Sequence, residues 1–109
     1  MIVYNTIQKI DTLESIAPES FVFVMDTTDR SFLYTSHKDN ESIEFISGLD
    51  KVKGLDQLIK RDNFFSHEDS LSILKINRTD TSTILGIHLN KKRYSKSQLL
   101  ALDKCLKNN

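Results

Sequence analysis

Three histidines are the residues of this chain whose chemistry most often serves catalysis or metal binding: His37, His67 and His88. None of them has a second ligand nearby in sequence at the spacing of a metal site. The adjacent residues His67, Glu68 and Asp69 would point apart on a helix. His88 lies in an apolar run, where a strand histidine with one satisfied nitrogen is the ordinary case. We therefore expect no catalytic residue, no metal and no cofactor.

Sequence motifs for nucleophilic and phosphate chemistry are also missing. The chain has no Gly-x-Ser-x-Gly elbow, no His-Glu-x-x-His pair and no glycine-rich loop, and it contains only three glycines. Cys105 is the single cysteine, which excludes an intramolecular disulfide and a cysteine-based zinc site. An enzyme whose site lies between the sheet and the middle helices, built from distant residues that include the histidines, stays an alternative.

Basic residues gather near the C-terminal end, at Lys91-Lys92-Arg93-Tyr94 and Lys96. Residues 1–50 carry three basic and nine acidic side chains, whereas residues 51–109 carry twelve basic and six acidic ones. One interpretation is that the two halves face each other or are simply solvated. The other is that the basic side contacts an acidic partner or the phosphates of a nucleic acid.

The length and composition indicate one folded domain, residues 1–109. The first residues lack the basic flank and apolar stretch of a secretory signal, and no apolar run reaches the length of a membrane span. We expect a cytoplasmic protein that does not contact membranes. Few glycines and prolines, with many Lys, Asn, Ile and Ser residues, suggest a bacterial or viral gene.

The first half is expected to form a strand, a short helix and a β-hairpin, in that order. Residues 2–7 alternate as a strand does. Residues 11–14 resemble a helix cap, and a helix of one to two turns follows, which Pro18 closes by disfavouring helix at Ala17. Residues 21–25 read as a strand buried on both faces, and residues 31–36 as its hairpin partner. In that partner the two-residue period places Phe32 and Tyr34 on one face and Leu33 on the other.

The middle of the chain is expected to be helical and then extended. Residues 40–46 and the near-repeat of residues 48–53 and 54–59 predict short helices joined at Gly54, and their inward residues are Leu49, Val52, Leu55, Leu58 and Ile59. Residues 66–69 resemble a helix cap. Residues 70–77 fit strand and helix, and we favour strand. Residues 83–89 predict a strand in which Gly86 marks a bend or a close backbone contact.

The last element is an amphipathic helix over residues 96–106 that follows Ser95. A helix of about eleven residues is marginal in isolation, so its leucine stripe must pack on the sheet or on another chain. We take the partner-binding residues to be Lys91, Lys92, Arg93, Tyr94, Leu99, Leu102 and Leu106.

Three stretches in order resemble a PAS sensor domain. Residues 21–36 resemble its opening strands, and residues 65–69 its loop in which a His and an Asp lead into a short helix. Residues 84–92 resemble its last strand and the exit into a connecting helix. The resemblance implies helices on one face of a sheet, an optional small-molecule cavity and signalling through dimer contacts of terminal helices.

Taken together, the sequence predicts an α+β domain with an antiparallel sheet of four to five strands, short helices and a C-terminal amphipathic helix. The function we expect is that of a small non-enzymatic regulatory module that associates with a protein partner or a second copy, as a PAS-like sensor would. The alternative is a nucleic-acid-binding protein that uses Lys91, Lys92, Arg93 and Lys96.

Overall fold

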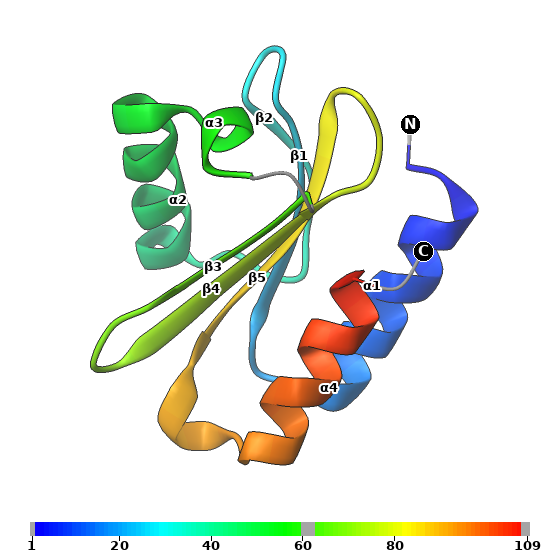
Figure 1. Cartoon of the computed structure of the whole chain (residues 1–109), viewed down its shortest axis with the longest axis vertical. Helices are drawn as coiled ribbons and strands as arrows, with labels where there is room; N and C mark the ends of the chain where they lie inside the picture. The colour runs from blue at the N-terminus through cyan, green and yellow to red at the C-terminus, as the bar shows by residue number, and fades with distance from the viewer. Residues whose placement is uncertain (1, 60–62, 108–109) are drawn as a thin grey trace.

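The computed structural model describes residues 2–59 and 63–107, which form one antiparallel sheet with helices on both faces (Figure 1). The strands are β1 (Phe21–Asp26), β2 (Ser31–Thr35), β3 (Phe64–Glu68), β4 (Ser72–Arg78) and β5 (Thr83–Asn90), in the order β2-β1-β5-β4-β3. The helices are α1 (Tyr4–Ile16), α2 (Asn40–Lys53), α3 (Leu55–Leu58), the 3-10 turn η1 (Lys91–Arg93) and α4 (Lys96–Lys107). The predicted α+β class with a five-stranded antiparallel sheet and a C-terminal helix is confirmed.

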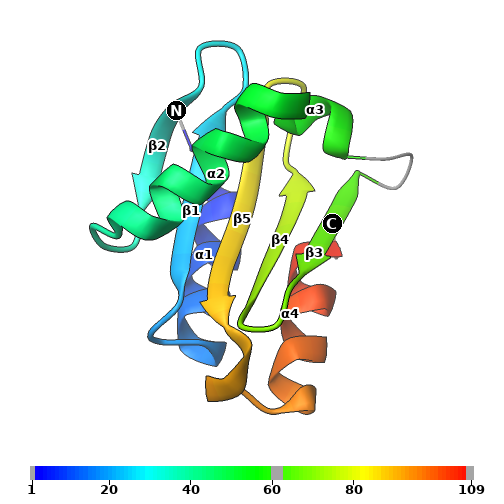
Figure 2. The same cartoon turned by 90° about the vertical axis from the view of Figure 1, so that its left-hand side faces the viewer.

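The sheet separates two hydrophobic cores. Helices α1 and α4 lie side by side on one face, and α2 and α3 cover the other (Figures 1 and 2). Strand β1 serves both cores, since Val22 and Val24 face α1 and α4 whereas Phe21 and Phe23 face α2 and α3. The prediction of a strand buried on both faces is thus confirmed. The arrangement with helices on one face only, which the PAS resemblance implied, is wrong.

The N-terminal segment is a helix, so the strand predicted for residues 2–7 is wrong. Helix α1 runs from Tyr4 to Ile16, and its buried residues Thr6, Ile10 and Leu13 recur at helical spacing. Ile10 and Leu13 pack in the core with the sheet and α4, a tertiary contact that outweighs the loose alternation at the start of the chain. The helix ends at Ala17, whose N–H donates to the Leu13 carbonyl (2.9 Å), just before Pro18.

A β-bulge changes the side-chain pattern of β2. Val24 pairs with Tyr34, but Met25 pairs with Phe32, so Leu33 is an extra residue opposite the β1 strand. Tyr34 consequently packs against the α1 and α4 core while Phe32 packs against the α2 and α3 core. The prediction that Phe32 and Tyr34 share one face is wrong for this reason.

Residues 64–68 form the edge strand β3, so the helix cap predicted over residues 66–69 is wrong. The Asp69 carboxylate accepts hydrogen bonds from the N–H groups of Leu71 (2.8 Å) and Ser72 (2.7 Å) and closes the β3–β4 hairpin. A helix cap and this turn both need a side-chain oxygen that accepts from backbone N–H groups, so the same sequence pattern fits either structure. The strand favoured for residues 70–77 is confirmed as β4.

Two glycines hold the positions that the sequence indicated. Gly54 joins α2 to α3 with a φ of 71°, a conformation that glycine adopts without strain. Gly86 lies under the Phe23 ring, and a Cβ atom there would come within 2.3 Å of Phe23 Cζ. Val52, predicted to face inward, is 79% exposed because it lies on the outer side of α2.

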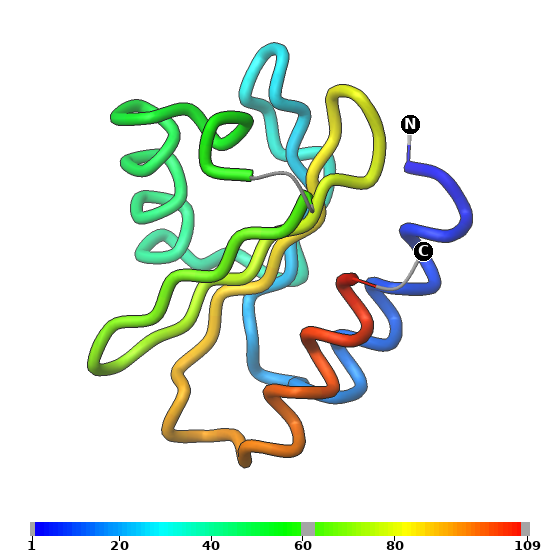
Figure 3. The backbone as a smooth tube through the Cα atoms, in the orientation of Figure 1, coloured from blue at the N-terminus to red at the C-terminus, as the bar shows by residue number. Residues whose placement is uncertain are grey.

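Helix α4 packs inside the molecule. Ser95 caps its start, because Ser95 Oγ accepts a hydrogen bond from Gln98 N (3.2 Å). Gln98 Nε2 donates to the Ile16 carbonyl (3.2 Å), and Cys105 Sγ lies 3.7 Å from the Lys9 carbonyl, so the first and last helices are joined along their length (Figure 3). None of the described helices is long and apolar enough to cross a membrane.

Candidate interaction surface

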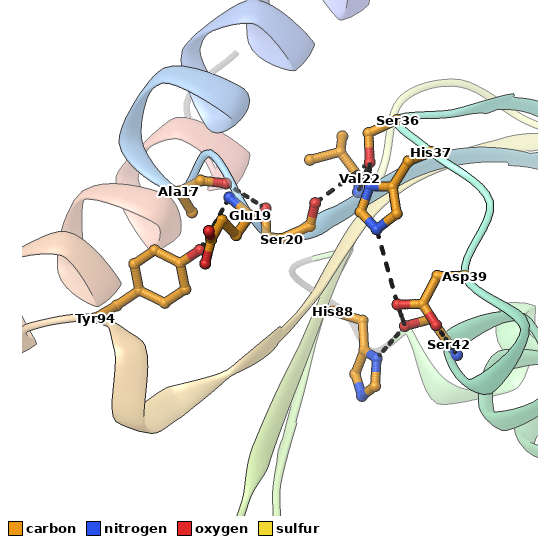
Figure 4. Close-up of polar contacts among 10 residues, drawn as sticks. All are labelled: Ala17, Glu19, Ser20, Val22, Ser36, His37, Asp39, Ser42, His88 and Tyr94. Carbon is orange, nitrogen blue, oxygen red and sulfur yellow. Dashed lines mark hydrogen bonds and ion pairs between the residues drawn. The ribbon is translucent and has the colours of Figure 1, made fainter.

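A polar cluster at the start of α2 brings two histidines together (Figure 4). Asp39 caps α2, and its carboxylate accepts hydrogen bonds from Ser42 N (3.1 Å) and Ser42 Oγ (2.9 Å). His88 Nδ1 from β5 lies 2.8 Å from the same Ser42 oxygen. His37 Nε2 lies 3.9 Å from Asp39 Oδ2 on the other side. His67 is on β3 and does not join these hydrogen bonds; its ring centroid lies 6.2 Å from that of Phe45.

The hydrogen bonds run from His88 to Ser42 to Asp39, and in this order the histidine does not activate the Ser42 hydroxyl as a nucleophile. Ser42 has one hydroxyl proton and donates it to Asp39, so its oxygen accepts the Nδ1–H of His88. In a catalytic triad the histidine lies between the acid and the serine and removes the serine proton. Here the serine occupies the middle position. The arrangement is a helix cap extended to the neighbouring strand, and it fixes α2 on the sheet.

His88 is held in its neutral form. Burial lowers its pKa, although Asp39 opposes the shift. Its ring stacks on Phe45 with centroids 5.0 Å apart, and its Nε2 is buried without a hydrogen-bond partner within residues 2–59 and 63–107. Protonation would place an unpaired N–H donor in that position. Across the same residues, no group of three or more His, Cys, Asp or Glu side chains could hold a metal ion.

The basic residues of η1 are largely engaged within the molecule. Lys91 Nζ lies 2.7 Å from Glu68 Oε2 and lowers the pKa of that carboxyl. Arg93 forms an ion pair with Glu19, whose N–H donates to the Tyr94 hydroxyl (3.2 Å). Lys92 and Lys96 are exposed and have no ion pair among the described residues. Two of the four cations in the predicted nucleic-acid surface therefore already have acidic partners.

The acidic first half and the basic second half of the chain are not joined by a network of ion pairs among the described residues. Among the lysine and arginine ion pairs of the described residues, only that between Arg93 and Glu19 links residues 1–50 to the rest. Few of the opposite charges of the two halves are therefore paired directly with each other.

The leucine stripe of α4 serves the fold. Leu102 and Leu106 are 0% exposed and Leu99 packs against the same core, so the first two cannot contact a partner without opening the structure. Leu100, on the outer side of the helix, is 60% exposed. Of the predicted partner-binding residues, Lys92 and Arg93 are exposed, and Lys91, Tyr94 and Leu99 are partly exposed. Partner binding by these residues stays a prediction.

Strand β3 presents an open edge that the sequence reading missed. It pairs with β4 on one side, and no described strand lies on its other side (Figure 2). The bonds from Arg78 N to the Asn63 carbonyl (3.0 Å) and from Asp69 N to the Ser72 carbonyl (3.0 Å) fix the hydrogen-bonding phase. Since bonded and non-bonded pairs alternate in an antiparallel ladder, Ser66 and Glu68 direct their backbone N–H and C=O groups to the open edge.

The fold resembles that of MglB. No protein-family model matches the sequence, and no curated protein matches it. A solved structure of MglB with a tetrameric arrangement has a TM-score of 0.58 at 11% identity, covering 99% of this chain and 88% of that one. The MglB structure from Myxococcus xanthus has a TM-score of 0.56 at 17% identity, covering 96% of this chain and 91% of that one.

These likenesses overturn the PAS resemblance. They extend over nearly the whole chain, whereas the PAS-like stretches were three short segments. The chain has the fold of these MglB structures.

Proposed function

We propose that this protein is a small non-enzymatic regulatory module that acts by protein–protein association. The observation that carries the proposal is the open edge of β3 on an MglB-like fold. The cluster of Ser42 and His88 supports it, since its proton arrangement builds a helix cap and leaves no activated nucleophile. On the analogy of fold with MglB, the partner we propose first is a small GTPase.

The first association is with a second copy of the chain through β3. An exposed edge strand offers a row of backbone donors and acceptors that another strand can satisfy. Two β3 strands related by a two-fold axis would run antiparallel, with Ser66 of each copy opposite the other. The outward groups of Ser66 and Glu68 would then form the continuous ladder. The sheets of both copies would join into one.

The second association uses the basic side of η1 and α4. Lys91 and Arg93 are held by Glu68 and Glu19, so they shape the surface, while the exposed Lys92 and Lys96 stay available to an acidic protein partner. Charge complementarity of this kind raises the rate of encounter and weakens as salt is added.

A single substitution tests the β3 association. Proline at Ser66 removes an N–H that points to the open edge and leaves the β3–β4 ladder intact. We expect the unchanged chain to show twice its mass of 12.6 kDa in light scattering after gel filtration, and Ser66→Pro to return it to one chain mass. Far-ultraviolet circular dichroism should be the same for both.

The matched control lies on the opposite edge of the sheet. Ser36 and Val22 form a hydrogen-bonded pair, in which Ser36 N donates to the Val22 carbonyl. Because bonded and non-bonded pairs alternate, the N–H and C=O groups of Thr35 on β2 point to the open edge of that strand, as those of Ser66 do on β3. Thr35→Pro should leave the dimer intact. A strictly monomeric unchanged chain, or equal association by both proline variants, would refute the β3 interface.

The partner surface is tested by charge reversal. A capture experiment with nucleotide-loaded small GTPases should lose binding with Lys92→Glu and Lys96→Glu, while Lys51→Glu on α2 serves as the control because it is exposed on the other side of the sheet. Equal retention by all variants would exclude the basic side as the contact.

A further inference from the structure

Strand β3 has an acidic side chain at its C-terminal end, on the face of the sheet that α1 and α4 cover. Phe64, at the other end of the strand, packs against the core of α1 and α4, whereas Phe65 packs against the core of α2 and α3. Because side chains alternate along a strand, Ser66 and Glu68 share the face of Phe64. Four residues at about 3.3 Å each separate Glu68 from Phe64, so the two ends lie about 13 Å apart.

A lysine of α4 lies at the Phe64 end of this edge. Lys107 Nζ is 4.5 Å from the centroid of the Phe64 ring, which is within the range of a cation–π contact. Lys107 is exposed and forms no ion pair within residues 2–59 and 63–107. The aromatic ring positions the ammonium group at the edge of the sheet but does not neutralise its charge.

The lining of a groove on α4 adds to this positive charge. The groove has a volume of about 570 Å³ and is lined by Leu100, Asp103, Lys104 and Lys107. Its one acidic residue, Asp103, is already paired with Lys75 of β4 (2.6 Å). Lys104 is exposed and, like Lys107, has no ion pair in the part of the chain that the structure describes. An acidic side chain of a partner at this edge would therefore meet two unpaired lysines.

Glu68, at the opposite end, can accept a second cation. One of its carboxylate oxygens, Oε2, accepts a hydrogen bond from Lys91 Nζ (2.7 Å), and the side chain is 58% exposed. A carboxylate has two oxygens with about four acceptor positions in all. Its contact with Lys91 thus leaves room for a lysine of another molecule.

A two-fold axis would bring these two ends together. In a symmetric dimer interface, each residue contacts its complement on the other copy, and the complement contacts it in return. All five residues of β3 overlap only when Ser66 lies opposite Ser66 of the second copy, and Phe64 then lies opposite Glu68 of the second copy. A register centred on Glu68 would instead place two carboxylates opposite each other, which is destabilising.

We propose that the Lys107 ammonium of each copy pairs with the Glu68 carboxylate of the second copy, and that this pair selects the register of the β3 dimer. The inference rests on the association proposed for β3 and names the residues that make the edge specific for a second copy of the chain. The axis repeats the pair, so each dimer contains it twice. On the other face, the same register sets His67 opposite Phe65 of the second copy, a cross-strand aromatic pair.

Charge reversal with analytical ultracentrifugation tests the pair. Lys107→Glu and Glu68→Lys should each raise the dissociation constant of the dimer about tenfold, because two attractive contacts become repulsive. In an equimolar mixture of the two variants, both contacts of a heterodimer again join opposite charges. With one variant labelled with ¹⁵N, native mass spectrometry should therefore find more heterodimer than random pairing gives.

The matched control is Lys38→Glu, which reverses an exposed lysine beyond β2, the opposite edge strand of the sheet. It should leave the dissociation constant unchanged. Mixed with Glu68→Lys, it offers the same net charges as Lys107→Glu but not the second ion pair. This mixture should contain no excess of heterodimer.

Failure of the ion pair and failure of the β3 dimer have different signatures. If Ser66→Pro gives monomers but both charge variants dimerise as the unchanged chain does, the β3 interface stands and the pair is wrong. Random pairing in the mixture of Lys107→Glu and Glu68→Lys would assign the weakening to net charge and refute the pair. A monomeric unchanged chain would overturn both. Glu68→Lys also breaks the contact with Lys91, so a folding defect in that variant leaves Lys107→Glu as an independent test.

Discussion

The buried ion pair between β4 and α4 gives a test of how the last helix is held. Lys75 Nζ lies 2.6 Å from Asp103 Oδ1, and the side chains are 8% and 28% exposed. The neighbouring Asn77 donates from Nδ2 to the Leu106 carbonyl, so two polar groups of β4 secure α4 among apolar contacts. Asp103→Leu would leave the Lys75 ammonium buried without its counter-ion.

The two partners should respond unequally. Removing one member of a fully buried pair costs about 3–5 kcal/mol, and because Asp103 is partly exposed to water we expect about 2–3 kcal/mol for Asp103→Leu. Lys75→Met leaves a carboxylate that can turn toward solvent, so its cost should be about 1 kcal/mol or less. The double variant should lie near the unchanged protein, because both charges are then gone.

Urea unfolding followed by circular dichroism measures these free energies by linear extrapolation. Lys104→Met, an exposed change on the same helix, provides the control and should change stability by less than about 0.5 kcal/mol. A cost below about 0.5 kcal/mol for Asp103→Leu, or a larger cost for Lys75→Met, would show that the ammonium is not desolvated as the structure indicates.

Three further perturbations have defined outcomes. Gly86→Ala should lower the free energy of unfolding by about 1–3 kcal/mol, because the added Cβ meets the buried Phe23 ring; an unchanged urea midpoint would contradict this contact. The lowered pKa of His88 contributes stability that is fully present above its ordinary value of 6.5 and lost as pH falls through the folded value. His88→Phe should therefore flatten the dependence of the unfolding free energy on pH between about pH 7 and pH 5. An equally steep dependence would argue against a neutral buried ring. Burial and the hydrogen bond to Glu14 Oε2 (2.5 Å) raise the pKa of Tyr34 to about 12, so Tyr34→Phe should remove the highest phenol transition from an ultraviolet pH titration; persistence of that transition would assign it elsewhere.

Local patterns in the sequence were enough for several elements. The apolar run of β1 indicated burial on both faces, and the spaced leucines after Ser95 indicated α4. Gly86 was expected to mark a close approach because only a missing side chain leaves room for one. The absence of catalytic motifs led to the prediction of a non-enzymatic protein, and the hydrogen bonds of Ser42 form a helix cap.

Other features depended on contacts between distant segments. Residues 4–7 belong to a helix because Ile10 and Leu13 pack with the sheet and α4. The cap-like residues 66–69 form a strand and a turn because β4 pairs with them. The bulge at Leu33 moves Tyr34 to the other face, which no two-residue period can reveal. Whether the α4 stripe faces a partner or its own sheet could not be read from its spacing.

The amino-acid sequence by itself determined which stretches must be buried, because apolar periodicity and turn chemistry are local properties. The tertiary structure decided what each buried stripe packs against and which edges of the sheet stay open. Those outcomes depend on pairing between residues far apart in the chain, where many arrangements satisfy the same local pattern.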